Sequence, residues 1–190
     1  MTRILSVGID DSLSWTGIAA VCRDDQYRKN SAELVCCGMI KGSGKHEWTA
    51  SAYHIAEHCH EVIMKVLHSQ PRFGQMEMRI LIELPYTWGM KSIVVARTGA
   101  VQKLYFLAGC IYGRMKGTNC MLVQVNTWKG SLPKKITYQR MKEKYGFRFP
   151  PTEKNFNMSD AVGIADYGLN KRTRDDFSLP QLQPSAFRVL

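Results

Sequence analysis

Three isolated carboxylates stand where apolar segments end or begin. Asp10 follows the apolar run over residues 3–9, Glu83 follows Ile-Leu-Ile, and Asp160 stands near the start of the last expected helix. If the first and fourth strands are neighbours, their carboxyl ends bring Asp10 and Glu83 together, and a helix packed against that rim adds Asp160. Three acids so close repel one another strongly unless cations lie between them. A pair of Mg²⁺ or Mn²⁺ ions about 4 Å apart suits such a site and hydrolyses phosphodiesters.

Each acid taken alone has a plainer explanation. Aspartate at a strand end is common in turns, and aspartate near a helix start complements the helix dipole. Glu83 is the hardest to explain in this way, because a carboxylate after three aliphatic residues is costly to bury without a partner. The metal-site prediction therefore depends on the three acids together.

The elements that position these acids follow from hydrophobic periodicity and turn signals. The expected strands are residues 3–9, 15–22, 34–40, 78–82 and 121–125. The expected helices are 47–68, much of 90–115, 134–145 after Pro133, and 157–169. The first three strands are separated by turn-like segments and predict an antiparallel meander. The whole order predicts an α/β fold, a mixed sheet with helices on its faces.

The charge and size of the chain favour one basic domain. Lys and Arg total 26 against 16 Asp and Glu, a formal charge of +10 in 190 residues that are 45% hydrophobic. Between residues 126 and 174 there are 11 basic and 4 acidic residues, so most of the excess lies in the last third. Positive charge gathered on one segment suits a phosphate backbone, which makes nucleic acid the leading partner class.

Cysteine usage and the lack of targeting signals predict an intracellular protein. The six cysteines include no C-x-x-C pair and read as reduced thiols. No leader with an apolar core and no apolar run of membrane-spanning length is visible, so no membrane partner is expected.

Two further motifs are more simply explained as chance. His54, Glu57 and His58 match the H-x-x-E-H pattern of a zinc-peptidase group, but a third ligand has no clear candidate and the basic charge would stay unexplained. Residues 42–45 read Gly-Ser-Gly-Lys, yet the leading glycine of a phosphate loop is missing, so a plain connection is expected.

Four segments resemble motifs of the RuvC-type Holliday-junction resolvases. Residues 8–17, GIDDSLSWTG, are similar to the first-strand motif, and Ile82-Glu83 is similar to the second acidic motif. Residues 128–135, WKGSLPKK, resemble the basic stretch, and residues 159–165, SDAVGIA, resemble the final helix. The motifs occur in the family's order, which is more specific than any one of them.

This resemblance implies a ribonuclease-H-like fold with a mixed five-stranded sheet, in which strands 1–3 are antiparallel and strands 4 and 5 parallel. It implies a nuclease domain over residues 1–174 with a C-terminal tail at 175–190. The activity implied is structure-selective, two-metal endonuclease cleavage of four-way or other branched DNA in recombination and repair. A homodimer located with DNA is expected. A ribonuclease-H-type or flap nuclease, and a non-catalytic junction-binding protein, remain as alternatives.

The resemblance also implies site residues. Asp10, Glu83 and Asp160 are expected to be catalytic and to bind Mg²⁺ or Mn²⁺. Asn157 stands where the family commonly has a fourth acid and is a neutral oxygen donor, so Asp11 and Asp166 are alternative sources of that ligand.

The DNA-binding residues implied by the resemblance lie in two segments. Lys129, Lys134 and Lys135 resemble the family's phosphate-contacting and charge-stabilising lysines. Tyr86 lies three residues after Glu83, where the family carries an aromatic residue that wedges at the crossover. Stacking of a base on an aromatic ring gives that role a physical basis.

Overall fold

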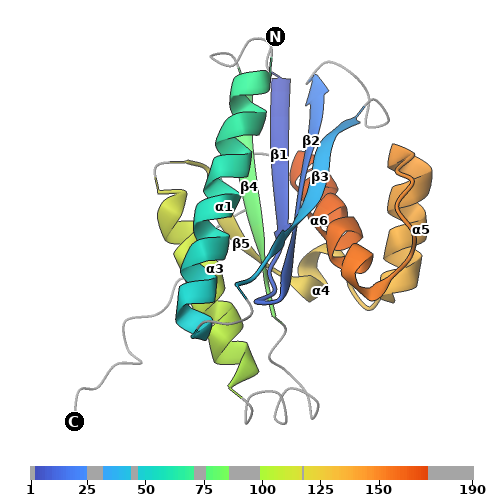
Figure 1. The fold of residues 1–190 in the computed structure, drawn as a ribbon. Coiled ribbons are helices and arrows are strands. Elements are labelled where there is room, and N and C mark those ends of the chain that lie inside the picture. Colours follow the sequence, from blue (N-terminus) through green and yellow to red (C-terminus); the bar gives the residue numbers. More distant parts are fainter. Residues whose placement is uncertain are drawn as a thin grey trace, which may run out of the picture.

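The computed structural model describes residues 3–24, 32–43, 47–70, 76–85, 99–116 and 118–170. In chain order the elements are β1 (Arg3–Asp10), β2 (Trp15–Asp24), β3 (Glu33–Lys41), α1 (Trp48–Ser69), β4 (Met76–Leu84), α3 (Ala100–Arg114), β5 (Cys120–Gln124), α4 (Val125–Trp128), α5 (Lys134–Tyr145) and α6 (Glu153–Asn170) (Figure 1). No helix in these ranges is long and apolar enough to cross a membrane.

The strands form one mixed sheet in the order β3-β2-β1-β4-β5. The pairs β1/β2 and β2/β3 are antiparallel, and the pairs β1/β4 and β4/β5 are parallel. This topology confirms the predicted fold class. The central strand β1 is buried on both faces, as expected for a strand whose sequence is almost continuously apolar.

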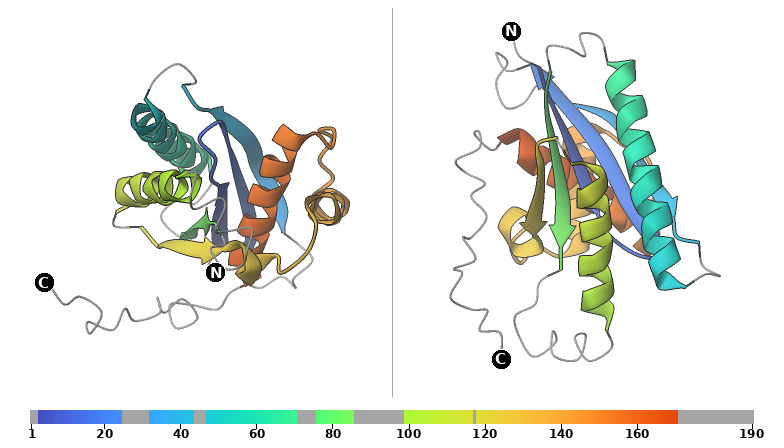
Figure 2. Two further views of the ribbon diagram at one scale, coloured as in Figure 1. Left: turned by 90° about the horizontal axis from the view of Figure 1, so that it is seen from below. Right: turned by 90° about the vertical axis from the view of Figure 1, so that its left-hand side faces the viewer.

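Helices cover both faces of the sheet. Figure 2 shows α1 and α3 together on one face, and α6 on the other with α5 outside it. Alternate residues of β1 pack against the helices on the two faces of the sheet, because successive side chains on a strand point to opposite faces. Leu5, Val7 and Ile9 belong to the core under α1 and α3, whereas Ile4 packs with α5 and α6.

Glycines let the backbone of α6 approach the sheet closely. A Cβ at Gly8 of β1 would lie 2.1 Å from the Ala161 carbonyl oxygen, and a Cβ at Gly17 of β2 would lie 2.1 Å from the Asn157 carbonyl oxygen. Neither atom can move without a shift of the helix itself. These two glycines therefore set the distance between α6 and the strands that it crosses.

Two arginines hold the far end of α6. Arg23 Nη2 donates to the Leu169 carbonyl at 2.8 Å, and the buried Arg79 donates through Nη1 to the Gly168 carbonyl at 2.9 Å. The last carbonyls of a helix have no partner within the helix, so these bonds satisfy two of them and fix where the helix ends on the sheet.

The structure differs from the expected elements at two points. The last helix begins at Glu153 rather than at residue 157, after Pro150 and Pro151. The short helix α4 follows β5 directly and was not expected, because four residues are too few to show periodicity. The first part of the helix expected over 90–115, and the tail expected at 175–190, lie outside the described residues.

Candidate active site

Asp10 and Glu83 lie side by side because of the register of two parallel strands. Ile9 of β1 pairs with Ile82 of β4, so Asp10 and Glu83 are the next residues at the same edge of the sheet. Both lie on the face that α6 covers, since they alternate with Ile9 and Ile82 of the opposite core. Asp10 is buried, with 7% of its surface exposed.

Asp160 comes to these two acids from α6. It is 1% exposed, and it directly precedes Ala161, whose carbonyl lies against Gly8. The acids also act on each other electrostatically, because the charges of Glu83 and Asp160 both raise the pKa of Asp10. The structure therefore brings together the three acids predicted as catalytic.

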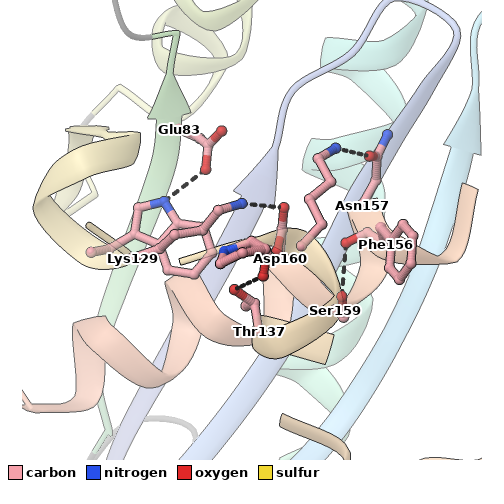
Figure 3. A network of polar contacts seen from close by, with 10 residues as sticks. Glu83, Lys129, Thr137, Phe156, Asn157, Ser159 and Asp160 are labelled. Carbon is pink, nitrogen blue, oxygen red and sulfur yellow. Dashed lines mark hydrogen bonds and ion pairs between the residues drawn. The ribbon is translucent and has the colours of Figure 1, made fainter. Parts of the chain in front are cut away.

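Nitrogen donors hold two of the three carboxylates. Trp128 Nε1 donates to Glu83 Oε2, and Lys129 Nζ donates to Asp160 Oδ2, each at 2.7 Å (Figure 3). Lys129 and Asp160 form a buried ion pair, with side chains 9% and 2% exposed. The donors are adjacent residues at the end of α4, so this short helix contacts both acids.

Burial and mutual repulsion make the carboxylates weak acids. Burial raises the pKa of Asp10, the charges of Glu83 and Asp160 raise it further, and Lys134 opposes the shift. Burial raises the pKa of Glu83 to about 7, although the Trp128 hydrogen bond lowers it. Burial also raises the pKa of Asp160 against the effect of Lys129. Lys129 and Lys134 therefore offset only part of the effect of burial and repulsion on the three carboxylates.

The unpartnered oxygens of this cluster fit a divalent cation. Asp10 Oδ2, Asp11 Oδ2 and Asp160 Oδ1 are buried and accept no hydrogen bond. Hard cations prefer carboxylate oxygens, and a buried acceptor without a partner is unfavourable. In the present rotamers, no three His, Cys, Asp or Glu side chains within the described ranges converge on one ion.

Asn157, the predicted fourth ligand, has a partner at each end of its amide. Its Nδ2 donates to the Trp15 carbonyl at 2.8 Å, and its Oδ1 accepts from Lys134 Nζ at 3.3 Å (Figure 3). The first bond ties α6 to the start of β2. The amide oxygen lies beside the same lysine that lowers the pKa of Asp10 and Glu83, so it borders the acid cluster.

The two alternative fourth ligands lie differently. Asp11 is buried, and burial and the charge of Glu83 raise its pKa, so it lies close enough to the cluster to interact with it. Its charge also adds to the burial that raises the pKa of Cys59 on α1 to about 12. Asp166 accepts from Lys144 Nζ at 2.7 Å and from Tyr145 hydroxyl at 2.6 Å through one oxygen. Asp166 therefore bonds to side chains of α5 and not to the acid cluster.

The predicted DNA-binding residues separate into three kinds. Lys134 and Lys135 are exposed at the N-terminus of α5, where phosphate could reach them. Lys129 is buried in an ion pair with Asp160, and its predicted role stays a prediction. Tyr86 lies outside the described residues, so its predicted role stays a prediction.

The H-x-x-E-H motif forms no group of three metal-ligating side chains within the described ranges, and part of the Gly-Ser-Gly-Lys segment lies outside them. His54 and His58 lie one turn apart on α1 with ring centroids 4.1 Å apart, and His58 Nδ1 contacts the His54 carbonyl at 2.9 Å.

Trp128 is the site residue that sequence reasoning missed. It stands in the basic segment beside Lys129, but no spacing rule indicated that its indole would reach Glu83.

Comparisons with known proteins give structural matches only. No protein-family model and no curated protein sequence matches the chain. The structure of Thermus thermophilus RuvC in complex with a Holliday junction substrate matches with a TM-score of 0.59 and 18% identity, covering 88% of this chain and 92% of that chain. A second T. thermophilus RuvC structure matches with a TM-score of 0.57 and 17% identity, covering 87% and 92%. The chain therefore has the ribonuclease-H-like fold of RuvC, as the sequence motifs predicted.

Proposed function

We propose that this protein is a divalent-metal-dependent endonuclease that cleaves four-way or other branched DNA. The observation that carries the proposal is the convergence of Asp10, Glu83 and Asp160 from β1, β4 and α6, with buried oxygens that lack partners. The RuvC fold supports the substrate class, since one of the matching structures contains a Holliday junction.

In this proposal the three acids hold Mg²⁺ or Mn²⁺, with two ions expected per site. Bound ions would activate the attacking water and stabilise the leaving oxygen. Asp10 interacts with both other acids, because the charges of Glu83 and Asp160 raise its pKa. Lys134 adds positive charge where a scissile phosphate would approach, and Asn157 Oδ1 is the proposed weak fourth ligand.

The basic segment supports DNA as the partner. Helix α5 and the start of α6 present exposed cations, namely Lys134, Lys135, Arg140, Lys142 and Lys154, and the first of these acts on the acid cluster. A phosphate backbone lying across the N-terminus of α5 would meet Lys134 and Lys135 and then reach the acids. The protein is accordingly proposed to act where DNA is, in recombination or repair.

A homodimer is part of the proposal, and one face of α3 supports it. Gly109 and Gly113 are exposed, and a Cβ at either would meet nothing within 4 Å, while Tyr105 and Tyr112 are exposed nearby. Glycine inside a helix costs about 1 kcal/mol relative to alanine, so the isolated chain gives no reason for it. Close approach of the α3 helix of a second copy would explain the two glycines. Sedimentation velocity measures whether the protein is a dimer.

The deciding experiment compares cleavage of a labelled four-way junction with that of linear duplex, in Mg²⁺, Mn²⁺ or chelator. Asp10→Asn, Glu83→Gln and Asp160→Asn should each abolish cleavage and leave junction binding largely intact. Glu143→Gln, which changes an exposed acid of α5, is the matched control and should cleave normally. Near-wild-type nicking by any one of the three would exclude the proposed site.

The same experiment addresses the alternatives. Preferred cleavage of an RNA–DNA hybrid or a flap would indicate a ribonuclease-H-type or flap nuclease. The non-catalytic alternative is favoured by one observation, the engagement of Glu83 and Asp160 by nitrogen donors. Junction binding without any Mn²⁺-dependent nicking would support it.

A further inference from the structure

Trp128 contacts the acid cluster through one atom and the helix α6 through its ring. Its Nε1 donates to Glu83 Oε2 at 2.7 Å, the bond drawn at the Glu83 carboxylate in Figure 3. Its ring packs beside the small core cluster of Leu81, Val123 and Ile164. The indole thus spans from β4 to α6 and joins two of the elements that supply acids.

Gly163 is the residue that makes room for this indole. A Cβ at position 163 would lie 2.5 Å from Trp128 Cζ3 and 3.3 Å from Cη2. Glycine weakens a helix interior relative to alanine, and Gly163 lies among the buried residues of α6. The space that the Trp128 ring needs therefore explains why a glycine stands at a helix position where alanine would be more stable.

We infer that Trp128 is a positioning residue that fixes the orientation of the Glu83 carboxylate. The inference deepens the proposed function and rests on it. An indole N–H is a donor only, so it binds one carboxylate oxygen and leaves the other free. With Oε2 held by Trp128, Oε1 is the oxygen assigned to a cation. Partners of this kind hold a ligating side chain in place, and their loss weakens metal binding.

The simpler alternative is that Trp128 only fills space between β5 and α6. The two explanations differ for a ring that lacks the N–H group. Trp128→Phe keeps an aromatic ring above Gly163 but removes the donor to Glu83. If Trp128 only fills space, metal affinity should not change.

The first test is calorimetric titration of Mn²⁺ into the full-length protein without DNA. Trp128→Phe is expected to weaken Mn²⁺ binding by about 10- to 100-fold, the usual effect of removing such a partner. Trp48→Phe is the matched control, because Trp48 lies at the start of α1 against Phe106, on the opposite face of the sheet. Thermal unfolding in chelator shows that each variant is folded.

A double-mutant cycle tests the contact between Gly163 and the Trp128 ring. Gly163→Ala should displace the indole and weaken Mn²⁺ binding as Trp128→Phe does. In a Trp128→Ala background the same alanine meets no ring, so Gly163→Ala should cause no further loss. Additive losses would mean that Gly163 acts independently of Trp128 and would overturn the inference.

Glu83→Gln separates failure of this inference from failure of the proposed function. If Glu83→Gln leaves Mn²⁺ affinity unchanged, Glu83 is not a metal ligand and both the proposed site and the inference fail. If Glu83→Gln weakens binding but Trp128→Phe does not, only the positioning role fails. If both weaken binding, adding Trp128→Phe to Glu83→Gln should cause little further loss.

Discussion

At the scale of single residues, the acid cluster couples stability to pH. The pKa of Glu83 rises on folding from an ordinary 4.5 to about 7, mainly through burial. Burial raises the pKa of Asp10, Asp11 and Asp160 in the same direction. The folded protein therefore binds protons more tightly than the unfolded chain, and this arrangement disfavours folding at neutral pH without metal.

The expected result is a loss of stability as pH rises in chelator. Below about pH 4.5 Glu83 is protonated in both the folded and the unfolded protein, so its contribution to the free energy of unfolding is fully present. This contribution is lost as pH rises through about 7. Urea unfolding between pH 4.5 and 8 measures the slope for wild type and Glu83→Gln. The variant should show a flatter profile, and Mn²⁺ should stabilise wild type most at high pH. Parallel profiles would show that Glu83 keeps an ordinary pKa in the folded protein.

Asn157→Asp should have two opposing effects at the same residue. A fourth carboxylate should lower the Mg²⁺ or Mn²⁺ concentration needed for half-maximal cleavage, because charge in the site increases. It should also cost about 1 kcal/mol in chelator, because Asp cannot donate to the Trp15 carbonyl as Asn157 Nδ2 does. A metal titration of cleavage and urea unfolding in chelator measure the two effects. Coincident titration curves would remove Asn157 from the site.

At the scale of elements, α6 depends on two positions of the sheet that have no side chain. Gly8 and Gly17 admit its backbone at Ala161 and Asn157, which lie on either side of Asp160. The distance from Asp160 to Asp10 is therefore set by glycines in β1 and β2. A residue that enlarges either position acts on the site through the helix.

Gly8→Ala is expected to destabilise the protein by about 1–3 kcal/mol, the usual cost of overpacking, and to abolish cleavage. The added Cβ would lie 2.1 Å from a backbone oxygen, so the helix must move. Gly38→Ala in β3 is the matched control, because a Cβ there meets nothing within 4 Å. Urea unfolding and junction cleavage measure both variants. Equal stability of the two would show that α6 does not need the close approach.

Sequence alone could predict the elements that carry repeated patterns and the acids at their ends. Asp10 and Glu83 were expected to meet on the condition that the first and fourth strands are neighbours, and β1 and β4 are indeed parallel neighbours. Helix α4 could not be predicted, because four residues carry no period. The contacts of Trp128 and Asp166 depend on how α4 and α5 pack, and long-range packing of this kind leaves no spacing in the sequence.

At the scale of the whole molecule, the basic charge is divided between two tasks. Lys129 neutralises Asp160 inside the protein, whereas Lys134 and Lys135 are exposed at the start of α5. Only exposed cations can release counterions from DNA. The excess charge of the last third therefore overstates the number of phosphate contacts.

Lys134→Ala combined with Lys135→Ala should weaken binding to all DNA forms and flatten its salt dependence. Each lost phosphate contact should reduce the slope of log affinity against log salt by about 0.9 for duplex DNA. Fluorescence anisotropy measures this slope with junction and with duplex DNA, at salt concentrations from about 50 to about 300 mM. Lys116→Ala, an exposed lysine after α3, is the control. An unchanged slope would place Lys134 and Lys135 off the DNA path.

The arginine bonds fix the end of α6 that lies far from the acids. Arg79 grips the Gly168 carbonyl, eight residues beyond Asp160, which is roughly 12 Å along a helix. The position of Asp160 therefore depends on this anchor as well as on the close approach of α6 at Gly8 and Gly17. Substitutions at Arg23 or Arg79 should therefore impair cleavage, although the bonds of both side chains lie at the other end of α6 from Asp160.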